Sequence, residues 1–226
     1  MQSSRRECRE RYTASRLLPR PMTGPEARRS LATDAVHLEP DEQSAHTELV
    51  EATRRLHDAV MASHAPTATL REAASFVRRA ADKLMGYPVH WPHQVAGMQF
   101  HLPGRGQVLT PPVHIEELGE TLIRARWTFT PFYDGGGGVV LGGAVPLVLD
   151  ELCGRLANHV AGKLARTAYL RVDFRNVTRV GREVVLRACV ERIEGRKIFV
   201  SGAVRDAQDV LCEVSGLFIR ARADEV

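Results

Sequence analysis

Four runs of alternating apolar and polar residues follow one another between about residue 170 and residue 218. Their apolar positions are Leu170, Val172, Phe174, Val184, Leu186, Ala188, Val190, Ile198, Val200, Gly202, Val204, Cys212, Val214, Gly216 and Phe218. A period of two is typical of strands that bury one face and expose the other. The turn sequences EGRK (Glu194–Lys197) and DAQD (Asp206–Asp209) separate the last three runs. Connections this short join antiparallel neighbours, so we expect an antiparallel meander.

One long helix is predicted before these strands, from about Gly143 to Val160. Pro146 falls in its first turn, where proline is tolerated. Its apolar residues recur at spacings of three and four, as in a helix that buries one stripe: Val145, Val148, Leu149, Leu152, Leu156 and Val160. A further strand is predicted over Ile123–Phe129, where apolar and polar residues alternate. A single helix segregated from a run of strands indicates an α+β fold.

The sequence before residue 120 divides into three segments of different character. Residues 1–40 are rich in arginine, proline, serine and threonine without a sustained period, and we expect them to be disordered. Residues 41–85 predict a helical extension of two helices, the second opening at Thr69 with Glu72 in a capping-box arrangement. Residues 86–112 predict a loop with at most a short strand. We therefore expect a folded domain over residues 86–226.

Charge, hydropathy and cysteine spacing exclude several classes of protein. The formal net charge of +4 suits an anionic small molecule and is too small for a nucleic-acid surface. No run of eighteen apolar residues predicts a membrane span, and no apolar segment follows the N-terminal arginines as in a secretory signal. The four cysteines, Cys8, Cys153, Cys189 and Cys212, are far apart. We expect them to be reduced and the protein to be cytoplasmic.

The segment GGGGVVLGGAVPLVLDELCG, residues 135–154, places six glycines before the predicted helix and the pair Asp150–Glu151 inside it. Glycine weakens ordered structure unless the backbone needs unusual dihedrals or close approach. A carboxylate in an apolar segment is costly to bury unless it is paired or used. The run lacks the lysine and hydroxyl residue of a phosphate loop. The sequence HWPH at residues 90–93 lacks further metal ligands at a suitable spacing, so we expect neither metal nor cofactor.

Two segments resemble the PaaI-like acyl-CoA thioesterases. LGGAVPLVLDELCG is similar to the signature that runs from a glycine pair to an aspartate in that family. RTAYLRVDFRNVTRVGREVVLRACVERIEGRKIFVSGAVRD is similar to the family's strand block after the helix. The resemblance covers about residues 121–220. It implies a hotdog fold, in which a curved antiparallel sheet wraps a long central helix, here with an N-terminal helical extension. It also implies an enzyme that hydrolyses acyl-CoA thioesters.

The resemblance implies roles for residues of the helix and of the following strand. Asp150 matches the catalytic aspartate, which acts as nucleophile or as base for water across a dimer interface. Thr167 matches a serine or threonine at the start of the next strand. Backbone N–H groups at a helix N-terminus stabilise negative charge, so Gly142 and Gly143 are predicted to polarise the thioester carbonyl. Glu151, about 100° further round the helix, is the second candidate carboxylate.

The chain departs from the family at two positions, and alternatives remain open. Leu141 stands where the family has histidine, and Gly135 where it often has a polar residue. The glycine pair also suits a flexible loop with tight helix–sheet packing. Asp150 also suits an interface carboxylate paired with Arg155 or Arg171. Leu141 favours the alternative function, a non-catalytic hotdog protein that binds acyl thioesters or acts as an assembly subunit. Dehydration is disfavoured, because no histidine lies beside the acidic pair.

The expected partners are acyl-CoA and further copies of the chain. CoA carries phosphates, and basic residues of the strand block are candidates for binding them, although solvated strand faces explain them equally well: Arg171, Arg175, Arg179, Arg182, Arg196 and Lys197. A single hotdog sheet leaves one helix face and one sheet edge uncovered, and exposed edges favour pairing. We therefore expect a homodimer or homotetramer, with no nucleic-acid partner.

Overall fold

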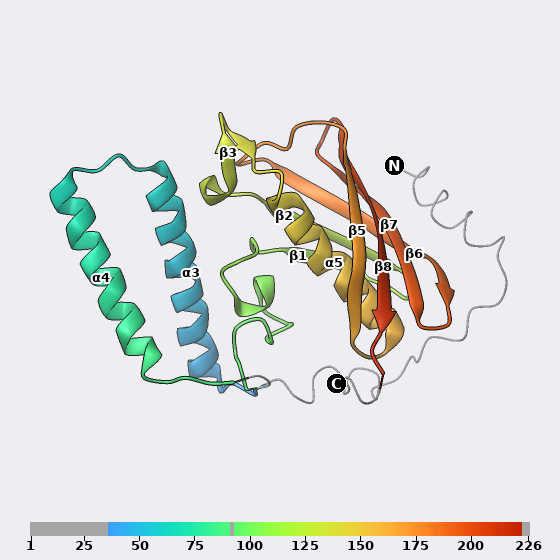
Figure 1. The fold of residues 1–226 in the computed structure, drawn as a ribbon, viewed down its shortest axis with the longest axis horizontal. Helices are drawn as coiled ribbons and strands as arrows, with labels where there is room; N and C mark the ends of the chain where they lie inside the picture. The colour runs from blue at the N-terminus through green and yellow to red at the C-terminus, as the bar shows by residue number, and fades with distance from the viewer. Residues whose placement is uncertain (1–35, 91–92, 223–226) are drawn as a thin grey trace. The chain divides into compact units, whose positions relative to one another are not determined.

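The structure is a computed structural model that describes residues 36–90 and 93–222. These residues form two compact units, one up to residue 108 and one from residue 109 onward (Figure 1). The prediction of disorder over residues 1–40 falls mainly on residues 1–35, which lie outside this description. No described helix is long and apolar enough to cross a membrane.

The first unit contains two helices, α3 (Pro40–Ala62) and α4 (Thr67–Met85), and a short 3₁₀ helix, η1 (Pro103–Gly106). The two predicted helices are therefore present. The predicted capping box at Thr69 is wrong, because α4 begins at Thr67 directly after Pro66, whose backbone is already extended (ψ 151°). A capping box is found instead on α3, where Glu39 N–H donates to the Glu42 carboxylate at 3.0 Å.

The second unit consists of one helix and a six-stranded antiparallel sheet of order β1-β2-β6-β7-β8-β5, with a separate β3–β4 hairpin. Its elements are β1 (His114–Leu118), β2 (Leu122–Thr128), η2 (Pro131–Tyr133), β3 (Asp134–Gly136), β4 (Val139–Val140), α5 (Ala144–Ala161), β5 (Ala165–Phe174), β6 (Glu183–Glu194), β7 (Lys197–Arg205) and β8 (Val210–Arg220). The predicted central helix and the strands on either side of it are confirmed. The unit has the α+β hotdog fold.

Strand β1 was not predicted from the sequence. It is a five-residue edge strand, HIEEL, and only Ile115 within it is partly buried. A strand that buries so little has no clear apolar alternation. It is held by pairing with β2, by packing of Ile115 against the core and by ion pairs of Glu116 with Arg124 and Arg126.

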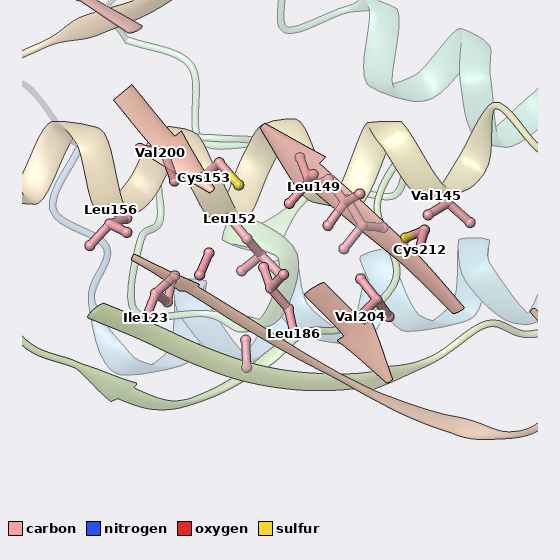
Figure 2. Close-up of a cluster of buried hydrophobic side chains, with 14 of the residues drawn as sticks. Ile123, Val145, Leu149, Leu152, Cys153, Leu156, Leu186, Val200, Val204 and Cys212 are labelled. Atoms are coloured by element: carbon pink, nitrogen blue, oxygen red, sulfur yellow. The ribbon is translucent and has the colours of Figure 1, made fainter. Parts of the chain in front are cut away.

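The hydrophobic core lies between α5 and the sheet (Figure 1). Figure 2 shows Leu149, Leu152 and Leu156 of α5 facing Leu186 and other strand side chains. These helix side chains are at most 1% exposed, as the predicted stripe requires. Fully burying one such side chain stabilises the fold by about 1.5–3 kcal/mol. The stripe therefore fixes α5 on the sheet, and with it the position of the helix N-terminus.

The cysteines follow the prediction in part. Cys153 and Cys212 are free and buried in the core, as expected (Figure 2). The expectation of a reduced thiol is wrong for Cys189, which is disulfide-bonded. Cys8 lies outside the described residues.

Gly202 allows strands β6 and β7 to pair closely. A Cβ atom at Gly202 would lie 2.6 Å from both the Ala188 Cβ and the Arg187 carbonyl oxygen. We predict that Gly202→Ala lowers the free energy of unfolding by about 1–3 kcal/mol, because backbone atoms cannot move aside cheaply. Urea unfolding measures this change, with Ser215→Ala on the exposed face of β8 as control. An unfolding free energy for Gly202→Ala equal to that of the control would contradict the packing.

The buried thiol of Cys153 makes the free energy of unfolding depend on pH in the alkaline range. Burial, with smaller contributions from the charges at Asp150 and Cys212, raises its pKa from 9.0 to about 12. A raised pKa in the folded state stabilises the fold below the unfolded pKa, and this stability is lost as the pH rises toward 12. Between about pH 8 and about pH 10.5 we expect the parent to lose roughly 2 kcal/mol more stability than Cys153→Ala. Parallel pH profiles in urea unfolding would contradict this expectation.

Candidate active site

The glycine run forms the tip of the β3–β4 hairpin. Gly136, Gly137 and Gly138 have φ angles of 129°, 63° and 75°, which residues with a side chain rarely adopt. The Asp134 carboxylate accepts hydrogen bonds from the N–H groups of Gly136 (2.7 Å) and Gly138 (3.4 Å). Gly135 has a different reason to be glycine, since its Cβ would lie 2.9 Å from the Leu141 Cα. The fold itself therefore requires these four glycines.

Gly142 and Gly143, at the N-terminus of α5, are not required by the fold in this way. Neither has a positive φ, and Gly143 is the N-cap with ordinary angles of φ −72° and ψ −20°. Apart from the adjoining residues of the chain, no atom lies within 4 Å of a Cβ placed at either residue, so tight packing does not explain them. Both are exposed, and among the described residues no acceptor is hydrogen-bonded to either N–H group. These two amides are open to an anionic or polarised oxygen.

Asp150 lies two turns into α5, on its exposed side. Its Oδ1 accepts a hydrogen bond of 2.7 Å from the Thr167 hydroxyl on β5. The two arginines considered as partners are engaged elsewhere, Arg155 with Glu151 (3.0 Å) and Arg171 with Asp173 (3.0 Å). Within the described part of the chain Asp150 makes no ion pair. The carboxylate is thus oriented by one hydroxyl and otherwise accessible.

Glu151 is in a different environment from its neighbour. Its carboxylate forms an ion pair with Arg155 one turn further along α5, and the two side chains are only 11% and 17% exposed. A carboxylate held and shielded in this way has less freedom to meet a substrate than that of Asp150. The resemblance already ranked Asp150 above Glu151, and the structure adds a physical difference between them, since Asp150 is exposed and Glu151 is held by Arg155.

Leu141, directly before the glycine pair, is 58% exposed and offers no polar group. Its N–H donates to the Tyr133 carbonyl oxygen at 2.8 Å, and its own carbonyl accepts from the Ala144 N–H at 2.9 Å. These bonds hold the glycine segment between the hairpin and α5. No group of three or more histidine, cysteine or acidic residues that could hold a metal is found among residues 36–90 and 93–222.

The glycine amides and the Asp150 carboxylate do not meet within one chain. Seven residues of helix separate Gly143 from Asp150, which corresponds to about 10 Å along the axis. Reacting atoms must approach to about 3–3.5 Å. One thioester carbonyl therefore cannot contact both groups of the same α5.

Comparisons with known proteins find thioesterases at the level of both a family model and individual relatives. Residues 137–213 match the thioesterase superfamily. Acyl-coenzyme A thioesterase THEM4 of Xenopus laevis is 35% identical over 92 residues, which is 40% of this chain and 41% of that protein. Acyl-coenzyme A thioesterase THEM5 of Mus musculus is 33% identical over 97 residues, 42% of this chain and 39% of that protein. The chain thus spans about two fifths of the length of these curated relatives.

A solved structure extends the likeness beyond the hotdog unit. The crystal structure of a thioesterase superfamily protein superposes with a TM-score of 0.67 at 27% identity, covering 82% of this chain and 94% of the other. The hotdog unit is only about half of the present chain. The alignment therefore includes part of the helical unit as well.

Proposed function

We propose that this chain, which carries a hotdog domain of the thioesterase superfamily, hydrolyses the thioester of an acyl-CoA to a free acid and CoA. The observation that carries the proposal is the glycine pair at the N-terminus of α5, whose amides are open although the fold does not require glycine there. The relatives named acyl-coenzyme A thioesterases support the same substrate, although this chain spans only two fifths of their length.

In the proposed mechanism, the N–H groups of Gly142 and Gly143 donate to the thioester carbonyl oxygen. They stabilise the negative charge that this oxygen gains on attack. The Asp150 carboxylate takes a proton from the attacking water. The C–S bond then breaks, and the CoA sulfur receives a proton as the acid leaves. Alternatively, Asp150 attacks the carbonyl carbon itself, the C–S bond breaks, and CoA leaves as a thiolate that takes up a proton. Water then hydrolyses the resulting mixed anhydride to the free acid and the Asp150 carboxylate.

Thr167 has a positioning role in this proposal. Its hydroxyl donates to Oδ1 of Asp150, which leaves Oδ2 for the water or for the carbonyl carbon. Glu151 is assigned the lesser role of back-up carboxylate, because its ion pair with Arg155 already holds it. No metal or cofactor is needed for any of these steps.

The proposal includes a homodimer, in which Asp150 of one copy faces the glycine pair of the other. The separation of about 10 Å along one helix supports this arrangement. Strand β5 is an edge of the sheet, and its exposed backbone groups favour pairing with another strand. A homotetramer would double the same unit. We further propose a cytoplasmic location, which the free thiols of Cys153 and Cys212 support and the disulfide at Cys189 opposes.

The second candidate function is a hotdog protein that binds acyl thioesters without cleaving them, or that serves as an assembly subunit. Leu141 favours it, because this exposed side chain provides no polar group where PaaI-like enzymes have histidine. Both functions predict that the chain binds acyl-CoA, but only the first predicts that it hydrolyses acyl-CoA. Measuring binding and turnover of the same acyl-CoA therefore distinguishes them.

Asp150→Asn keeps the size of the side chain and removes its charge. We expect acyl-CoA turnover to fall by at least about a hundredfold, the usual contribution of a positioned acid–base group. Acyl-CoA binding should change little, because the amides of Gly142 and Gly143 remain. Release of free thiol measures turnover, and calorimetry measures binding.

Controls for this experiment come from nearby residues. Asp173→Asn removes the same charge further along β5 and should leave turnover within about twofold. Thr167→Val should lower turnover by about tenfold, as for the loss of one hydrogen bond to a charged group. Loss of activity in Glu151→Gln alone would move the assignment to Glu151. An inactive parent that still binds acyl-CoA would favour the non-catalytic function.

Assembly provides a separate prediction. Light scattering at micromolar concentration should give a mass of about two or four times the chain mass of 25.0 kDa. A second experiment mixes equal amounts of Asp150→Asn and of Gly143→Pro, which lacks one amide. Half of the dimers are then mixed, and each mixed dimer has one intact site of two. The mixture should therefore recover up to about a quarter of the parent activity. A stable monomer with full activity would contradict the shared site.

A further inference from the structure

The two helices of the first unit do not cover one another. In Figure 1, α3 and α4 run in opposite directions and are joined by residues 63–66. A connection this short normally lets antiparallel helices pack together. Here α3 and α4 make little or no contact. The connector has extended backbone at Ser63 (ψ 148°) and at Pro66 (ψ 151°), which holds the helices apart.

Helix α4 buries none of its residues, although its apolar residues share one side. Leu70, Ala73, Val77, Ala80 and Leu84 recur at spacings of three and four, which defines the α4 stripe. The three large side chains of the stripe are between 42% and 54% exposed. Because a helix in a protein is stabilised mainly by packing of such a stripe, α4 requires a partner outside the described chain.

Helix α3 is held on one face and open on another. Arg54 donates hydrogen bonds to the carbonyl oxygens of Pro103 and Gln107, which fixes this face on the segment around η1. Leu49 lies about 140° around the helix from Arg54, and Val60, three turns further on, lies on the same side as Leu49. Both apolar side chains are exposed. The helical unit therefore presents two uncovered apolar stripes, one on each helix.

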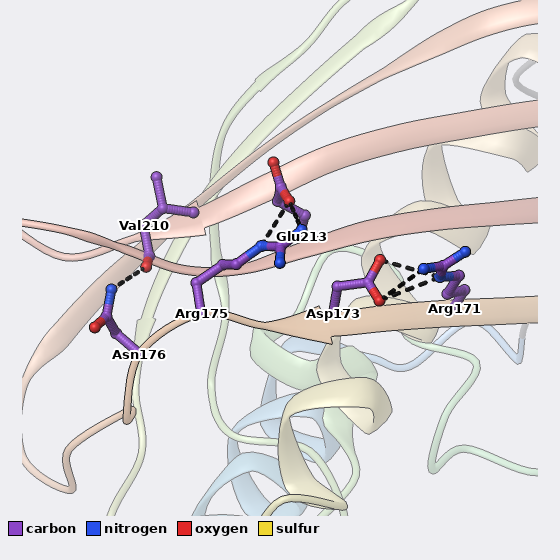
Figure 3. Close-up of polar contacts among 6 residues, drawn as sticks. All are labelled: Arg171, Asp173, Arg175, Asn176, Val210 and Glu213. Atoms are coloured by element: carbon purple, nitrogen blue, oxygen red, sulfur yellow. Dashed lines mark hydrogen bonds and ion pairs between the residues drawn. The ribbon is translucent and has the colours of Figure 1, made fainter.

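The two helices carry opposite net charges. α3 contains five carboxylates against two arginines, and α4 contains four basic residues against two carboxylates. In the hotdog unit exposed arginines are neutralised nearby, as Figure 3 shows for Arg171 with Asp173 and for Arg175 with Glu213. Among the described residues, no basic residue of α4 forms an ion pair. Two copies of α4 side by side would repel, whereas α4 beside α3 of another copy attracts.

We propose that the helical units of two copies of this chain pair as a four-helix bundle, in which α4 of each copy packs against α3 of the other. The contact is reciprocal, because each copy contributes one acidic and one basic helix. Four amphipathic helices then bury their stripes around one core, as in other bundles. Large side chains of the α4 stripe alternate with alanines, which allows close interdigitation. This interface is separate from the sheet edge at β5, and the inference does not depend on the proposed function.

Photo-crosslinking in the full chain identifies the residues that cover α4. Leu84→p-benzoylphenylalanine places a photoreactive ring in the stripe, at the C-terminal end of the helix. We expect irradiation to give a covalent dimer of about twice the chain mass of 25.0 kDa, with cross-linked peptides that join α4 to α3. A crosslink within one chain, to α4 of another copy or to any segment other than α3 would overturn the proposal. So would the absence of a crosslink.

A second substitution in the same photoreactive chain tests the apolar stripe. Val77→Glu places a charge in the proposed core and should lower the yield of covalent dimer by at least about tenfold. Ser75→Glu is the matched control, because it adds the same charge about 160° further round α4, on the polar side, and should leave the yield within about twofold. Equal losses in the two variants would contradict the stripe as the interface.

Salt tests the charge pairing between α3 and α4. Raising the ionic strength from about 0.05 M to about 1 M shortens the Debye length to about 3 Å, and we expect the yield of covalent dimer to fall by several-fold. A yield that stays constant or rises with salt would overturn the pairing of the basic helix with the acidic one.

Discussion

The burial of one apolar stripe of α5 against the sheet fixes the geometry of this domain. Leu149, Leu152 and Leu156 are almost fully buried, so the helix can neither rotate nor slide without exposing them. Because the stripe is fixed, the N-terminus of the helix and its uncovered side are fixed as well. The glycine pair lies at the N-terminus of α5, and Asp150 lies on its uncovered side.

Rigid placement on one helix also keeps the two polar features apart. Asp150 and the glycine amides are separated by about 10 Å of helix, which no side-chain movement closes. The bond from Thr167 orients the carboxylate from β5 without bringing it nearer to the amides. A second copy of α5 is the simplest way to complete the proposed site, and the exposed edge at β5 provides a surface for it.

The six glycines before α5 have two different physical roles. Those at residues 135–138 serve the hairpin, through positive φ angles and a close approach to Leu141. Those at residues 142–143 leave space above unpaired amides. The same hairpin is hydrogen-bonded to the loop between β5 and β6, which holds the segment before the glycine pair in place.

The sequence by itself determined the α5 helix, the strands around it and the α+β class, because apolar periodicity directly reflects burial against one core. It also indicated Asp150, Thr167 and the glycine pair, through a resemblance. It missed β1, which buries little, and it misplaced the capping box. The resemblance ranked Asp150 above Glu151, but only the tertiary structure showed that Asp150 is exposed and bonded to Thr167, and that Arg175 is paired with Glu213. These distinctions depend on contacts between residues far apart in the chain, such as Asp150 with Thr167 and Arg175 with Glu213, which local sequence patterns do not encode.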